Sequence, residues 1–119
     1  MDTSTMTDAE LDIAVATDVM KWAKDEPWLG HERPYVGIFP DGAFNVYTPE
    51  SNHWSPATDM AHAWEVWEEL ERQGMRPGIY TRGTNGYRVH ADAGGNFWAD
   101  ADTACRAICL AALAAQEKT

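Results

Sequence analysis

The last segment of the chain, residues 104–115, constrains the fold more than any other. It reads ACRAICLAALAA, and Arg106 is its one charged side chain. The Asp and Thr side chains within residues 100–103 can cap a helix that begins there. A helix that is apolar on nearly every side has no face for water and has to be covered by other elements. We therefore expect this helix in the centre of the core, with the rest of the chain packed around it.

A first helix is predicted near the start of the chain. Thr7 and Glu10 have the spacing of a capping box, and Pro27 and Gly30 are expected to end the helix. An apolar stripe at helical period supports it. The stripe consists of Leu11, Ala14, Val15, Val19 and Trp22.

A second helix is predicted to end at Gly74, with Ser55 or Thr58 as its cap. The helical period places apolar side chains on one face and carboxylates on the opposite one. The apolar face comprises Met60, Ala63, Trp64, Trp67 and Leu70, and the carboxylates are Glu65, Glu68, Glu69 and Glu71.

Short apolar segments separated by turn-forming residues predict strands in two regions. Residues 35–39 and 43–47 flank an Asp-Gly pair, which is typical of a β-hairpin. Residues 78–82, 87–91 and 96–98 are separated by Asn-Gly and Gly-Gly pairs and predict a meander of two or three strands. This order predicts an α+β fold, a sandwich in which three helices pack on a small antiparallel sheet.

The length of 119 residues indicates one domain, 1–119, in which residues 1–6 form a disordered start. The domain is expected to fold alone or as a small oligomer. No apolar run approaches the ~20 residues of a membrane-spanning helix, and the first residues do not resemble a signal peptide. We therefore expect a cytoplasmic protein with no membrane partner.

The net charge of −10 is unevenly distributed along the chain. Residues 1–71 contain fifteen acidic and three basic side chains, whereas residues 72–119 contain four acidic and six basic ones. This balance disfavours direct nucleic-acid binding, which needs a basic surface. It permits a basic protein partner, and the alternative is that the carboxylates only keep the protein soluble.

Known catalytic and metal-binding motifs are not matched. Cys105 and Cys109 lie four residues apart and are expected to be buried free thiols. His62 and Glu65 invite comparison with the zinc deaminases, but both the His–Glu and the Cys–Cys intervals are one residue too long. No metal or cofactor is therefore expected. An enzyme with an unrecognised site remains an alternative, because a cleft is not visible in a sequence.

The strongest ligand-binding hypothesis falls on the meander. Strand alternation places Tyr80 and Arg82 on one face of their strand, and Arg88 and His90 on one face of the next. Guanidinium groups beside aromatic rings suit an anion or a nucleotide. The alternative is a solvated sheet face, or arginines that form salt bridges with the acidic helices.

A second hypothesis concerns a protein partner. Trp28 and Trp54 lie in polar loop segments, where a tryptophan either anchors a partner or covers an edge of the core. The acidic helix face with Glu65, Glu68 and Glu69 would contact the same partner.

Three stretches, LDIAVATDVMKW, ATDMAHAWEVWEEL and ADTACRAICLAALAA, resemble the phage ABA sandwich domain family. The resemblance extends over most of residues 8–115, and it implies an α/β/α sandwich encoded by a bacteriophage or prophage. It brings no catalytic residue. It implies an accessory protein that acts by binding, with a non-enzymatic antagonist of a host antiviral defence component as our first hypothesis. A protein that sequesters a nucleotide signal is the second.

Overall fold

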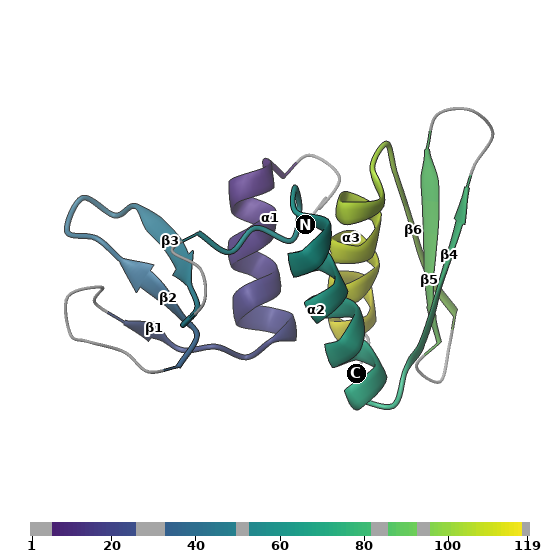
Figure 1. The fold of residues 1–119 in the computed structure, drawn as a ribbon, viewed down its shortest axis with the longest axis horizontal. Coiled ribbons are helices and arrows are strands. Elements are labelled where there is room, and N and C mark those ends of the chain that lie inside the picture. Colours follow the sequence, from purple (N-terminus) through teal and green to yellow (C-terminus); the bar gives the residue numbers. More distant parts are fainter. Residues whose placement is uncertain (1–5, 26–32, 50–52, 82–85, 93–95, 118–119) are drawn as a thin grey trace.

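The computed structural model describes residues 6–25, 33–49, 53–81, 86–92 and 96–117. It has three layers, with the helices in the middle and a three-stranded sheet on each side (Figure 1). The elements are α1 Asp8–Ala14, η2 Val15–Val19, β1 Lys24–Asp25, β2 Tyr35–Ile38, β3 Phe44–Tyr47, α2 Met60–Arg72, β4 Arg76–Thr81, β5 Tyr87–Asp92, β6 Asn96–Ala101 and α3 Ala104–Glu117. The predicted α+β class and element order are confirmed. The strands, however, form two sheets rather than one.

Helix α3 lies in the middle of the molecule, as its composition predicted. It packs against β5 and β6 on one side and against α1, η2 and α2 on the other (Figure 1). Ile108 and Cys109 are completely buried, and so are the small side chains around them. Thr103 Oγ1 accepts a hydrogen bond from the backbone N–H of Arg106 at 3.2 Å, which helps to cap the helix.

The capping box of α1 is present. Thr7 Oγ1 accepts from the N–H of Glu10 at 3.2 Å, and Glu10 Oε1 accepts from the N–H of Thr7 at 3.0 Å. The bond from the Thr7 N–H stabilises the ionised carboxylate of Glu10 and lowers its pKa.

The helix ends earlier than Pro27 and Gly30 predicted. After α1 the chain makes one wide π-helical turn, η2, and Lys21 then adopts a left-handed φ of 61°. Thr17 Oγ1 donates to the carbonyl of Ile13 at 3.0 Å, a competing local bond of the kind that bends helices. Pro27 and Gly30 lie outside the described residues.

The first sheet has the order β1–β2–β3 and packs on α1 and η2. The predicted hairpin is β2 and β3, joined by a turn in which Gly42 has a φ of 87°. Val36 and Val46 are the buried side chains on its inner face. Strand β1 pairs in parallel with β2 and was not predicted, because its two charged residues carry no apolar pattern.

Helix α2 begins at Met60, and its cap lies one residue after Thr58, the later of the two predicted capping positions. Asp59 is its cap, and Asp59 Oδ1 accepts from the N–H of Ala61 at 2.9 Å. Ser55 and Thr58 do not cap the helix, because their hydroxyl groups bond to each other at 2.7 Å. Gly74, with a φ of 90°, follows the last turn as predicted.

The buried face of α2 is narrower than the sequence suggested. Ala63, Val66 and Leu70 are fully buried. The prediction that Trp64 belongs to this face is wrong, since 44% of its surface is exposed. It lies one residue after Ala63, and therefore about 100° further around the helix.

The second sheet is the predicted meander and has the order β4–β5–β6. Its strands are six residues long, so the third strand extends beyond the 96–98 segment expected from the sequence. Val89 and Ala91 on its inner face are buried, and α3 covers that face. No helix or strand of the described residues lies over the outer face (Figure 1).

Candidate functional site

The outer face of the second sheet brings together three of the predicted ligand-binding residues. Tyr80 on β4 pairs with Arg88 on β5, and His90 pairs with Trp98 on β6. The Trp98 ring lies 4.4 Å from the His90 ring and 6.3 Å from that of Tyr80, measured between centroids. Tyr80 and Trp98 are 56% and 49% exposed. Arg82, the fourth predicted residue, lies outside the described residues.

The guanidinium group of Arg88 is bound to Asp100. The Nε and Nη2 atoms of Arg88 donate to the two oxygens of Asp100 at 2.8 and 3.1 Å. This bidentate pair raises the pKa of Arg88 above its usual value, and the guanidinium lies 5.3 Å from the centre of the Trp98 ring. Arg88 therefore forms a salt bridge, which was the alternative to ligand binding. Its carboxylate partner lies on the neighbouring strand β6 and not on an acidic helix.

Trp98 is the residue of this face that the sequence analysis missed. The predicted third segment of the meander ended at Trp98 and was too short to show on which face of the sheet this side chain lies. The strand extends to Ala101, and strand alternation places Trp98 and Asp100 on the same face.

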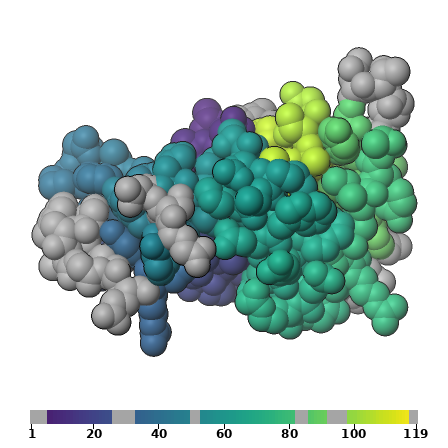
Figure 2. Space-filling view, viewed as in Figure 1, coloured from purple at the N-terminus to yellow at the C-terminus, as the bar shows by residue number. Residues whose placement is uncertain are grey.

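The outward face of α2 is a second candidate surface. Trp64 is held edge-on against Trp67, with 5.3 Å between the ring centroids. Glu68 and Glu71 follow Trp64 by four and seven residues, so they lie on the same side of the helix. In Figure 2 the surface of this helix occupies much of the middle of the face in view.

The predicted partner-binding carboxylates of α2 have different surroundings. The side-chain carboxylate of Glu68 makes no hydrogen bond or ion pair with any described residue, and the same holds for the carboxylate of Glu71. Glu69 pairs with Arg72 at 3.0 Å and accepts from Gln73 at 2.9 Å. Glu65 accepts from Trp54.

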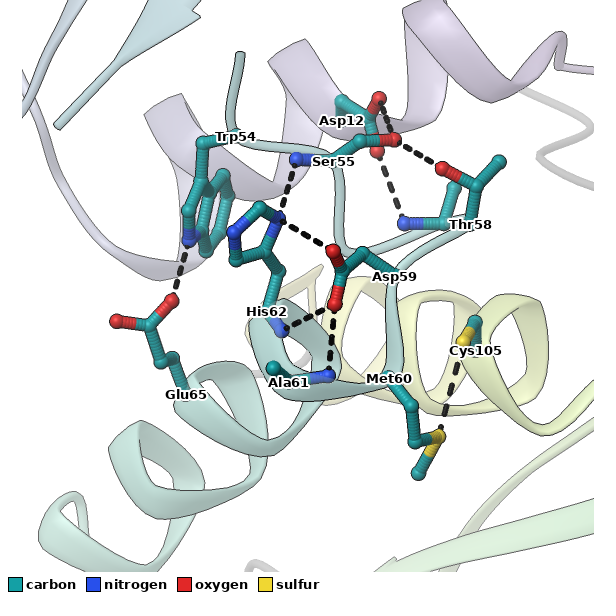
Figure 3. A network of polar contacts seen from close by, with 11 residues as sticks. Asp12, Trp54, Ser55, Thr58, Asp59, Met60, Ala61, His62, Glu65 and Cys105 are labelled. Carbon is teal, nitrogen blue, oxygen red and sulfur yellow. Dashed lines mark hydrogen bonds and ion pairs between the residues drawn. The ribbon is translucent and has the colours of Figure 1, made fainter. Parts of the chain in front are cut away.

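Trp54 belongs to the core, which decides between its two predicted roles. It is 1% exposed and contacts Trp22 edge-on, with ring centroids 4.6 Å apart. Its Nε1 atom donates to Glu65 Oε2 at 2.6 Å, which satisfies the buried indole N–H (Figure 3). Trp54 is thus not available as a partner anchor. Trp28 lies outside the described residues.

A buried polar network attaches the loop before α2 to α1 (Figure 3). The two oxygens of Asp12 accept from Ser55 Oγ at 2.7 Å and from the N–H of Ala57 at 2.9 Å. Asp12 is 4% exposed, and burial raises its pKa while the two hydrogen bonds lower it, so the net direction is upward.

His62 takes part in the same network without forming a catalytic triad. Its Nδ1 atom accepts from the backbone N–H of Ser55 at 2.9 Å (Figure 3). The hydroxyl of Ser55 donates to Asp12 instead of to the imidazole, so His62 is not placed to accept the hydroxyl proton. The arrangement attaches the loop to both α1 and α2.

A small hollow beside this network does not suit a metabolite. Its volume is about 30 Å³, and it is lined by Asp12, Phe44, His53 and Trp54 among others. This is room for about one water molecule, whereas small-molecule pockets have volumes of roughly 300–1,000 Å³.

The two thiols differ in exposure. Cys109 is fully buried and Cys105 is partly exposed, and both are free, as expected. Burial raises the pKa of each thiol. Cys105 Sγ lies 3.6 Å from the Met60 sulfur, so its surroundings are those of a packed side chain (Figure 3).

Among the described residues, none of the helices has the length and apolar composition that a membrane-spanning helix needs.

Comparison with known proteins gives one match. The family model of the phage ABA sandwich domain matches residues 13–113. Neither the search of curated proteins nor the search of solved structures returned a match.

Proposed function

The chain belongs to the phage ABA sandwich domain family, and we propose that it is an accessory protein that binds a basic host protein through the outward face of α2. The observation that supports this most directly is Trp64, a half-exposed tryptophan beside two carboxylates that have no partner among the described residues.

Trp64 has the properties of a binding anchor. Tryptophan, tyrosine and arginine dominate the energetic centres of protein interfaces. Its edge-on contact with Trp67 restricts the ring before any partner arrives, so less side-chain freedom is lost on binding. Glu68 and Glu71 follow Trp64 on the same side of the helix, which makes this side acidic.

An acidic surface with an exposed indole suits an arginine or lysine side chain. The ring face attracts the cation, an interaction of about 0.5–1 kcal/mol when exposed and about 2 kcal/mol when desolvated. The carboxylates can accept hydrogen bonds from the same cation. With a net charge of −10, the protein would also attract a basic partner during diffusion.

The family context supports a host target. Many host proteins that recognise foreign nucleic acid carry basic surfaces, because binding phosphate requires them. A small acidic protein that covers such a surface would compete with the nucleic acid. We therefore propose a non-enzymatic antagonist of an antiviral defence component, which acts by occupying its basic surface.

The test compares matched variants in binding to protein from host lysate. The parent, Trp64→Ala and Glu68→Lys/Glu71→Lys are immobilised, and Trp98→Ala serves as a control that removes an exposed tryptophan from a different element. A specific partner should be captured by the parent and the control and lost from the other two.

Titration of that partner, once purified, should show about tenfold weaker binding for Trp64→Ala. The affinity of the parent should fall as salt is added, because exposed charges are screened within ~10 Å at 0.1 M salt. Equal binding by all variants, or no dependence on salt, would exclude the α2 face.

Sequestration of a nucleotide has weaker support. A phosphate bound by Arg88 would have to displace Asp100 from the guanidinium, and that carboxylate would repel it. Extraction of nucleotides from the denatured, freshly purified protein tests this alternative directly.

A further inference from the structure

The outer face of the second sheet is a surface that the proposed function does not use. Its central positions are Tyr80, Arg88, His90, Trp98 and Asp100, on three adjacent strands. We call these five residues the aromatic sheet face. Two of its rings are about half exposed. A tryptophan and a tyrosine exposed on one face of a sheet are typical of an interaction surface.

The charges on the aromatic sheet face balance locally. Arg88 and Asp100 form an ion pair, and both side chains are 40% exposed. This part of the chain also differs from the rest, since the excess of acidic residues lies entirely within residues 1–71. Two copies of the protein that approach through their acidic surfaces repel each other. The aromatic sheet face avoids that repulsion.

The face is also complementary to itself. In a two-fold symmetric contact the same surface meets its own copy, so each cation needs a carboxylate within reach on that surface. Arg88 and Asp100 can stay paired in such a contact, since a rotated copy can place each pair antiparallel to its counterpart, with the charges alternating. The Tyr80 and Trp98 rings would fill the space between the sheets, which pack about 10 Å apart.

We propose that the chain forms a two-fold symmetric homodimer through the aromatic sheet face, with Trp98 and Tyr80 at the centre of the interface. A second copy fits better than a small anion, because the groups of Arg88 that would bind an anion already bind Asp100. This inference does not rest on the proposed partner of α2.

The size of the face predicts a weak dimer. Three strands of six residues, at about 3.3 Å per residue and about 4.8 Å between strands, form a face of roughly 20 × 14 Å. This is well below the ~800 Å² that each partner contributes to a standard interface. We therefore expect a dissociation constant in the micromolar range or weaker.

The experiment is sedimentation equilibrium of the full chain from about 5 to about 500 μM, a range chosen to include that dissociation constant. The parent should change from monomer to dimer as the concentration rises. Trp98→Ala should weaken the dimer about tenfold or more, whereas Trp64→Ala should leave it unchanged. Higher salt should favour the dimer, since it screens the repulsion between two acidic chains. This is the opposite of the salt effect expected for a basic partner.

Three results would overturn the proposal. They are a parent that stays monomeric throughout, a dimer that Trp98→Ala does not weaken, and a dimer that Trp64→Ala weakens equally. A nucleotide that binds the monomer in a Trp98-dependent manner would assign the face to a small ligand and would overturn it as well. Circular dichroism checks the fold of each variant, and Tyr80→Ala replaces Trp98→Ala if the latter does not fold.

Discussion

Asp12 has more influence on the loop before α2 than its position on α1 suggests. Its two bonds, to Ser55 and to Ala57, join segments more than forty residues apart. They also explain the capping of α2: with the Ser55 hydroxyl bonded to Asp12 and to Thr58, Asp59 is left to cap the helix. The Thr7 and Glu10 box was predictable because both partners lie within one turn.

The titration of Asp12 should be measurable in the stability of the protein. Burial raises its pKa above the value of ~3.9 in an unfolded chain, so the folded state binds the proton more tightly. Between that value and the raised pKa, the contribution of Asp12 to the free energy of unfolding decreases as the pH rises, and above this window it is constant. Asp12→Asn removes this dependence. Urea denaturation of both proteins across this pH range measures it, and parallel profiles would contradict the prediction.

At the level of elements, the sequence predicted the burial of a helix correctly where nearly all of its residues are apolar. It was less accurate where apolar and charged residues alternate. The apolar segment of α3 could only be buried. In α2 the helical period assigned Trp64 to the apolar face, whereas the structure buries Ala63, Val66 and Leu70 and leaves Trp64 half exposed. Strand β1 forms because it can pair with the free edge of β2. Its own two residues are charged and carry no strand pattern from which this pairing could be predicted.

The central position of α3 predicts a large effect of a charge within it. Ile108→Asp should unfold the domain, because a buried carboxylate without a partner costs several kcal/mol against a total stability of ~5–15 kcal/mol. Thermal unfolding followed by circular dichroism is the measurement. Ile108→Val is the conservative control and should cost only about 0.5–1.5 kcal/mol. A charged variant that melts with the parent would show that α3 is peripheral.

At the scale of the whole molecule, the sequence predicted the class and the order of the elements but not the division into two sheets. Helix α2 separates β3 from β4 along the chain, and nothing in their residues shows whether strands so separated pair. Pairing depends on which edges the helices leave open, which is decided by tertiary packing.

The shared helical layer predicts that both sheets unfold together. Val46 in the first sheet and Val89 in the second are both buried against it. Val46→Ala and Val89→Ala should each lower the stability by about 2 kcal/mol and shift a single transition. Tryptophan fluorescence and far-ultraviolet circular dichroism should give coincident curves in urea. Two separated transitions in either variant would indicate two independent units.

Helix α2 lies on the side of the second sheet that α3 covers, so Trp64 and Trp98 belong to surfaces that do not overlap (Figure 1). A pair of chains joined through their sheets would therefore display two α2 faces on one particle. A target with two basic sites could bind both α2 faces of one dimer. The second contact would then form within a complex that the first contact already holds together. Effective concentrations in such cases reach the millimolar range for short connections. Two individually modest contacts would then release their target slowly.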